Sequence, residues 1–252
     1  MYESSTSMTR AFRLDNQPCL LHIPEKPNGY LVLYLGDSGH YVEDNQAFWL
    51  EHPERSKFIH YLLDKGYTLF TSNLYGNAWG SKKSVHLLNQ LYQHVRRQVT
   101  VNPYIHVVAE GMGALTALHW QEKHNMAFRS MTFFTPCLSL KALYEQEQMN
   151  QLYFKRFKKE LAQSYEIDEN HIDHEIIKDY QMPKTSSPVL IFHDVANPYY
   201  TVHNHSRRFE EQQQEADHTV ELKLAIQPIL PRVTSTVLQF LRSYESTLEN
   251  PY

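Results

Sequence analysis

The residues with the clearest chemical implication form the segment IHVVAEGMGALTAL at positions 105–118. An apolar strand is followed by the turn Ala109-Glu110-Gly111-Met112-Gly113, and a helix is expected to begin near Met112. A sharp turn from a strand into a helix exposes the side chain at its centre, which is how some folds present a nucleophilic serine. Gly111 stands at that centre. Because glycine has no atom that can attack a carbonyl, the turn has the shape that nucleophilic catalysis uses but lacks the nucleophile.

The turn must be positioned by the strands and helices around it, and the sequence predicts that these alternate along the chain. A hairpin is predicted over 9–23, and apolar runs predict strands at 31–35, 67–71, 105–108, 130–134, 189–193 and 220–226. Helical spacing of apolar residues predicts helices over 54–65, 84–100, 206–214 and 231–248, besides the one that follows the turn. This alternation predicts one α/β domain over 1–252, with an eight-stranded, mostly parallel sheet covered by helices on both faces. The polar-rich helical stretch 138–182 predicts a small lid.

Composition excludes several other classes of protein. A net charge of −4 over 252 residues argues against a nucleic-acid partner, which would require a concentrated basic face. The two cysteines, Cys19 and Cys137, are too few for a disulfide framework and lack the spacing of zinc ligands. The polar N-terminus does not look like a signal peptide, and no apolar run is long enough to span a bilayer. We therefore expect a cytoplasmic protein, monomeric or homodimeric, without a membrane partner or a cofactor.

Four segments, in this order, resemble stretches of the α/β-hydrolase family: YLGDSGH (34–40), SNLYGNAWGS (72–81), AEGMGALTAL (109–118) and PVLIFHDVANPYY (188–200). The first is similar to the loop that supplies the oxyanion hole, and the second to a Gly-rich loop of small bacterial members. The third resembles the G-x-S-x-G nucleophile elbow, and the fourth resembles the stretch that carries the acid of the Ser-Asp-His triad. The resemblance runs over essentially the whole chain and implies an α/β-hydrolase fold.

The same resemblance implies a degenerate triad. The nucleophile position falls on Gly111, and the acid position falls on Asn197, which is neutral and cannot stabilise an imidazolium as a carboxylate does. The family's histidine should follow the last strand, where the closest counterpart is Pro228 and no histidine occurs from Val220 onward. We therefore expect a non-catalytic pseudo-hydrolase that binds a small ligand or acts as a regulatory protein.

The backbone N–H groups of such a site can remain in place when the triad residues are lost. The N–H of Met112, a second N–H from the loop 36–39 and the helix N-terminus would form a cradle for a small acyl, carboxylate or carbonyl ligand. The side chain of Glu110 counts against an anionic ligand if it faces the cleft. The expected binding residues are Gly36, Asp37, Ser38, His40, Trp79, Glu110, Met112 and His193.

A relocated catalytic centre is the main alternative, and it would make the protein a hydrolase of carboxylic or acyl esters. Ser38, Ser81 and Cys137 should lie near the carboxyl edge of the sheet, where such folds bind ligands. His40 or His193 could then serve as the base.

Two weaker patterns remain. Gly36-Asp37-Ser38 is similar to the G-D-S block of SGNH hydrolases, but the other blocks of that family are absent or misplaced. Asp168, His171, His174 and Glu175 have spacing that can ligate a divalent metal, as does His203-Asn204-His205, yet solvated side chains explain both patterns. We therefore assign no metal site.

Overall fold

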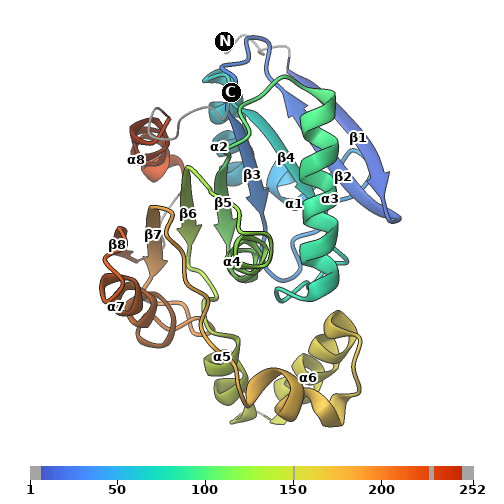
Figure 1. Ribbon diagram of the computed structural model, residues 1–252, viewed down its shortest axis with the longest axis vertical. Coiled ribbons are helices and arrows are strands. Elements are labelled where there is room, and N and C mark those ends of the chain that lie inside the picture. The colour runs from blue at the N-terminus through green and yellow to red at the C-terminus, as the bar shows by residue number, and fades with distance from the viewer. Residues whose placement is uncertain (1–6, 150, 227–229, 246–252) are drawn as a thin grey trace.

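A computed structural model describes residues 7–149, 151–226 and 230–245. Eight strands form a single sheet in the order β1-β2-β4-β3-β5-β6-β7-β8. The strand β2 pairs antiparallel with both β1 and β4, and every other neighbouring pair is parallel. The predicted sheet, with its N-terminal antiparallel hairpin, is thus confirmed (Figure 1).

The elements have the following bounds. The strands are β1 (Met8–Leu14), β2 (Gln17–Ile23), β3 (Leu31–Leu35), β4 (Thr68–Ser72), β5 (His106–Glu110), β6 (Ser130–Phe134), β7 (Val189–Asp194) and β8 (Val220–Ala225). The α-helices are α1 (Phe48–Glu51), α2 (Pro53–Asp64), α3 (Lys82–Gln98), α4 (Met112–His124), α5 (Leu140–Gln148), α6 (Gln151–Tyr165), α7 (Arg208–Gln214) and α8 (Leu230–Ser243). The sequence pattern did not predict the short helix α1, and a π-helical turn, His203–Arg207, precedes α7.

Two layers of helices cover the central strands because those strands are apolar on both faces. All five residues of β3, β4 and β6 are buried. The helices α3 and α4 pack on one face around Leu88, Leu115 and Trp120, whereas α2 and α8 pack on the other around Phe58 and Leu241. None of the helices in the described part of the chain has the length and apolar composition that crossing a bilayer requires.

The chain between β6 and β7 forms the helices α5 and α6 beyond the carboxyl ends of the parallel strands (Figure 1). The Ser164 hydroxyl donates to the carbonyl oxygen of Ala78 at 2.6 Å, and the Tyr165 hydroxyl donates to that of Trp79 at 2.8 Å. These bonds fix α6 against the loop that follows β4. The segment expected to be a lid therefore covers the edge of the sheet at which the turn of residues 109–113 lies.

Close packing at that turn requires small residues. Gly111 has φ 51° and ψ −122°, a conformation that side-chain-bearing residues rarely adopt. Gly113, in the first turn of α4, lies so close to β3 that an added Cβ would stand 2.7 Å from the carbonyl oxygen of Gly36 and 2.8 Å from Cβ of Leu35. The absence of side chains at 111 and 113 thus lets α4 begin directly against β3.

The contact at Gly113 predicts a reversal of the usual effect of Gly→Ala in a helix. That change normally stabilises a helix by about 1 kcal/mol. Here the new methyl group would press on backbone and on a buried side chain, an overpacking that costs about 1–3 kcal/mol. We expect G113A to lower the free energy of unfolding, measured by urea denaturation. An unchanged or raised midpoint would contradict the close contact between α4 and β3.

Candidate functional site

The space above Gly111 is filled by the carboxyl group of Asp37. A Cβ added to Gly111 would overlap both the carboxyl carbon and the carboxyl oxygens of Asp37, which follows β3. The side chain that would carry a nucleophile at this elbow is therefore replaced by a carboxyl group from a neighbouring loop. Gly111 and Asp37 are sterically coupled, since a side chain at 111 cannot coexist with Asp37 in this position.

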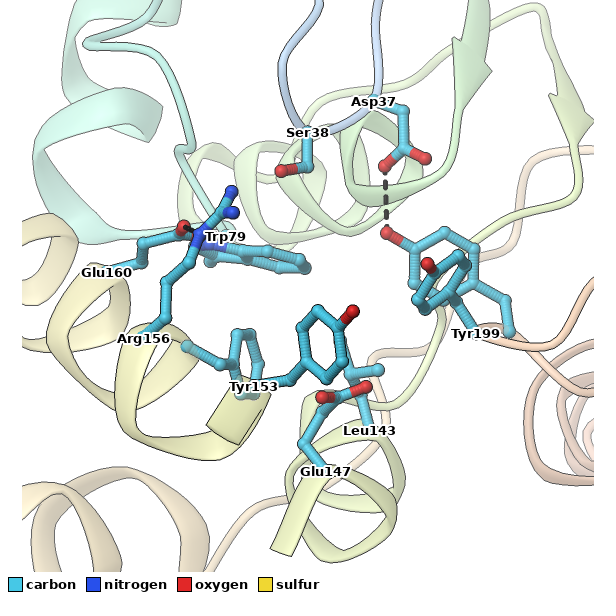
Figure 2. A pocket seen from close by; sticks show the side chains of 11 residues that line it. Asp37, Ser38, Trp79, Leu143, Glu147, Tyr153, Arg156, Glu160 and Tyr199 are labelled. Atoms are coloured by element: carbon cyan, nitrogen blue, oxygen red, sulfur yellow. Dashed lines mark hydrogen bonds and ion pairs between the residues drawn. The ribbon is translucent and has the colours of Figure 1, made fainter. Parts of the chain in front are cut away.

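Three donors hold the Asp37 carboxyl group. The backbone N–H of Met112 donates to Oδ1 at 2.9 Å, and the Tyr200 hydroxyl donates to the same oxygen at 2.8 Å (Figure 2). The backbone N–H of Ser38 also bonds the carboxyl group. The N–H groups of Met112 and Ser38 come from the two segments expected to form a cradle for a carbonyl or carboxylate. In this structure they bind a carboxyl group of the chain itself.

Burial changes the ionisation of this group. Loss of solvent is the largest influence and raises the pKa of Asp37, and the negative charge of Glu110 raises it slightly further. The hydrogen bonds from Met112, Ser38 and Tyr200 oppose this shift because they favour the carboxylate. The same environment raises the pKa of the Tyr200 hydroxyl well above its ordinary value, so Tyr200 remains a donor. Desolvation therefore dominates the electrostatics of the filled elbow.

Glu110 and His40 form a separate polar cluster beside the elbow. Arg55 binds the Glu110 carboxylate through both Nε, at 2.8 Å, and a terminal nitrogen. His40 stacks on Phe48 with 3.9 Å between ring centroids, and its Nδ1 accepts a hydrogen bond from the backbone N–H of Asp37 at 3.0 Å. Burial, followed by the charge of Arg55, lowers the pKa of His40 to about 4, so this ring is neutral near pH 7. The cluster supports the loop of residues 36–40 from behind.

Asn197, at the expected position of the triad's acid, and His193, near the end of β7, support the loop that contains Tyr199 and Tyr200. Oδ1 of Asn197 accepts the backbone N–H groups of Tyr199 at 2.9 Å and Tyr200 at 2.8 Å. His193 contacts the Ser206 hydroxyl through Nδ1 at 2.6 Å and the Tyr200 carbonyl oxygen through Nε2 at 2.7 Å. Both side chains thereby fix the loop that delivers the Tyr200 hydroxyl to Asp37. Pro228, the expected counterpart of the histidine, lies outside the described residues.

A cavity of about 300 Å³ opens between this filled elbow and the helices α5 and α6 (Figure 2). Its lining residues are Asp37, Ser38, Trp79, Leu143, Glu147, Tyr153, Arg156, Phe157, Glu160, Tyr199 and Tyr200. Of the binding residues expected from the sequence, Asp37, Ser38 and Trp79 line it. Gly36, His40 and Met112 line a separate void of about 20 Å³ behind the loop. Glu110 and His193 are engaged in the contacts described above.

Sequence reasoning missed most of the cavity wall. Tyr199 and Tyr200 belong to the segment that was singled out for its acid position, but nothing in the sequence indicated that Tyr200 contacts Asp37, 163 residues away. Glu147, Arg156 and Glu160 come from α5 and α6, and nothing in the spacing of these polar residues indicated that they line a cavity.

Within the described residues, the side chains considered as nucleophiles of a relocated catalytic centre form no hydrogen bond with a histidine. His40 and His193 use ring nitrogens in the contacts given above, and no hydrogen bond links either ring to the Ser38 hydroxyl in the described chain. The Ser81 hydroxyl is buried and bonds Ser84 at 3.3 Å. Burial raises the pKa of the Cys137 thiol well above its ordinary value, which disfavours a thiolate nucleophile.

The candidate metal ligands do not gather. His171 and Glu175 approach each other at 3.6 Å on an exposed turn. Among the residues that the structure describes, no three side chains of His, Cys, Asp or Glu are arranged to hold a metal ion.

Comparison with solved structures identifies the architecture. The chain superposes on Est1E from Butyrivibrio proteoclasticus with a TM-score of 0.63 and 12% identity, covering 94% of this chain and 98% of that one. It is similar to the Francisella virulence factor BioJ (TM-score 0.64, 13% identity, 96% and 86% covered) and to the Pyrococcus furiosus esterase Pf2001 (0.64, 14%, 96% and 93%). No family model matches the chain, and no curated protein matches it in sequence. The protein therefore has the α/β-hydrolase fold.

The raised pKa of Asp37 predicts how stability depends on pH. A group whose pKa is higher in the folded state than in the unfolded state binds more protons when folded, so stability falls as pH rises between the two pKa values. We expect wild type to lose stability relative to D37N from about pH 4 upward, and the difference to level off above the folded pKa of Asp37.

Urea denaturation of both proteins at several pH values measures this difference. D44N is a control, because the exposed Asp44 has its pKa lowered by Arg13 and should not show the same trend. A wild-type protein that gains stability relative to D37N with rising pH would contradict the dominance of burial at Asp37.

The overlap between Asp37 and a side chain at 111 predicts strong coupling of two substitutions. G111A alone should destabilise the protein by several kcal/mol, because it combines backbone strain of about 1–3 kcal/mol with a steric clash. In the D37G background the clash is gone, and only the strain should remain. A double-mutant cycle measures the difference. Additive effects of the two substitutions would show that Asp37 does not occupy the elbow.

Proposed function

We propose that this protein is a non-catalytic pseudo-hydrolase, which uses the cavity beneath α5 and α6 to bind a small ligand and thereby serves a binding or regulatory role. One observation carries the proposal: the carboxyl group of Asp37 lies above Gly111, on the backbone N–H groups of Met112 and Ser38.

This arrangement removes two requirements of acyl transfer together. Gly111 offers no nucleophile, and the N–H groups that would stabilise an oxyanion already bind Asp37. A single oxyanion-hole donor contributes about 10²–10³ to the rate in a serine hydrolase, and it must be free to meet the substrate oxygen. A substrate carbonyl would have to displace a buried carboxyl group that is also tied to Tyr200. An ester in the cavity is therefore expected to bind without reacting.

The cavity itself supports the binding half of the proposal. Its volume of about 300 Å³ lies at the lower end of the range for small-molecule sites. Trp79, Phe157 and Tyr200 are buried in its wall, whereas Tyr153 and Tyr199 are more than half exposed at its mouth. A wall of this kind can bury a small ligand, and the open mouth admits it.

The alternative, an ester hydrolase with relocated catalytic residues, has Ser38 as its best nucleophile because Ser38 lines the cavity. The two proposals differ in their response to a fluorophosphonate probe and to p-nitrophenyl butyrate. We expect neither covalent labelling, by mass spectrometry of the intact protein, nor release of nitrophenol above the rate without protein, while a serine esterase reacts under the same conditions. Stoichiometric labelling or turnover that disappears in S38A would overturn the pseudo-hydrolase proposal and support the alternative.

A further inference from the structure

The ionisable groups that line the cavity are mostly acidic, whereas an oxyanion site presents positive charge to its ligand. Three carboxyl groups, from Asp37, Glu147 and Glu160, line it, against the single guanidinium of Arg156. That guanidinium binds Glu160 at 2.9 Å, and the side chain of Arg156 is 75% exposed. It therefore balances Glu160 at the rim and leaves Asp37 and Glu147 without a cationic partner in the wall.

Glu147 is the acid best placed to meet a ligand. It lies on α5 and is half-buried, and its carboxylate has neither an ion pair nor a hydrogen bond within the described residues. Figure 2 shows it on the same wall of the cavity as Tyr153, which comes from α6. Asp37, by contrast, is anchored by Met112 and Tyr200 at the far end. A carboxyl group thus stands at the inner end of the cavity, and the carboxylate of Glu147 stands on its wall.

Aromatic rings make up most of the remaining surface. Trp79, Tyr153, Phe157, Tyr199 and Tyr200 supply five of the eleven lining residues. The faces of such rings attract cations, most strongly where water is excluded. In the described chain the contacts between Lys or Arg and aromatic rings involve other residues, such as Phe48 and Tyr75, so these five rings hold no cation of the protein.

We propose that the cavity binds a small organic cation, an ammonium compound with an apolar or aromatic body, held by the aromatic walls and the carboxylate of Glu147. The inference rests on the proposed binding function and names its ligand class. It also excludes the carboxylate ligand considered from the sequence, because Asp37 already uses the donors such a ligand would need and the carboxylate of Glu147 repels its charge.

Three probes of similar size, one cationic, one neutral and one anionic, test which ligand charge the cavity prefers: benzyltrimethylammonium, benzyl alcohol and phenylacetate. Calorimetric titration of the full chain at pH 7.5 should show the cation binding at least tenfold more tightly than phenylacetate. The N-methyl protons of the bound cation should also shift upfield in proton NMR, because they would lie over ring faces.

Two substitutions on α5 distinguish the effect of the Glu147 carboxylate beside the ligand from the effect of changing the net charge of the protein. E147Q should weaken binding of the cation about five- to tenfold, the size expected for one nearby charge in a partly buried site, and should leave benzyl alcohol unaffected. E145Q removes the same charge from an exposed position of the same helix, outside the cavity lining, and should leave the affinity of the cation unchanged.

Each outcome decides between the proposals. Equal or tighter binding of phenylacetate, no binding of any probe, or equal effects of E147Q and E145Q would overturn the cation site. Preferential binding of phenylacetate would leave a non-catalytic binding protein intact with a different ligand. Covalent labelling by the fluorophosphonate would overturn the pseudo-hydrolase proposal without deciding the charge preference of the cavity.

Discussion

The arrangement of the site depends on one steric and electrostatic constraint, the placement of the Asp37 carboxyl group in the space above Gly111. Only glycine leaves that space open, and only glycine adopts the backbone angles of the turn without strain. The carboxyl group then takes the N–H group of Met112, which would otherwise be free at the start of α4, and the N–H group of Ser38 in the loop after β3. The loss of a side chain at 111 and the presence of a carboxyl group at 37 are therefore two halves of one structural feature.

The loop after β7 completes this feature. Asn197 caps the turn at Tyr199 and Tyr200, and His193 binds the carbonyl oxygen of Tyr200. Asn197 and His193 thus hold the loop of Tyr200 in place, and the Tyr200 hydroxyl binds Asp37 from the cavity side.

Filling the elbow also changes what the cavity can recognise. In an oxyanion site the backbone dipoles present positive charge to the ligand, whereas here a buried carboxyl group stands between those dipoles and the cavity. The helices α5 and α6 add aromatic rings and further acids rather than free cations. The fold is shared with esterases such as Pf2001, but the chemistry at the corresponding place is set by these side chains.

The sequence alone determined an α/β domain with a mostly parallel sheet, because alternating apolar strands and amphipathic helices leave few ways to bury both faces of such a sheet. The resemblance of four segments to the α/β-hydrolase family implied the particular fold. The sequence also determined that Gly111 cannot act as a nucleophile. It could not determine that Asp37 fills the elbow, since the contacts joining Asp37 to Met112 and Tyr200 span 75 and 163 residues. Nor could it show that Glu147, Arg156 and Glu160 line the cavity, because the apolar stripes of α5 and α6 mark the faces that pack on the rest of the molecule and not the polar side chains beside the cavity. Only the tertiary structure decided the occupancy and the charge of the site, because both arise from side chains that the fold brings together from four separate segments.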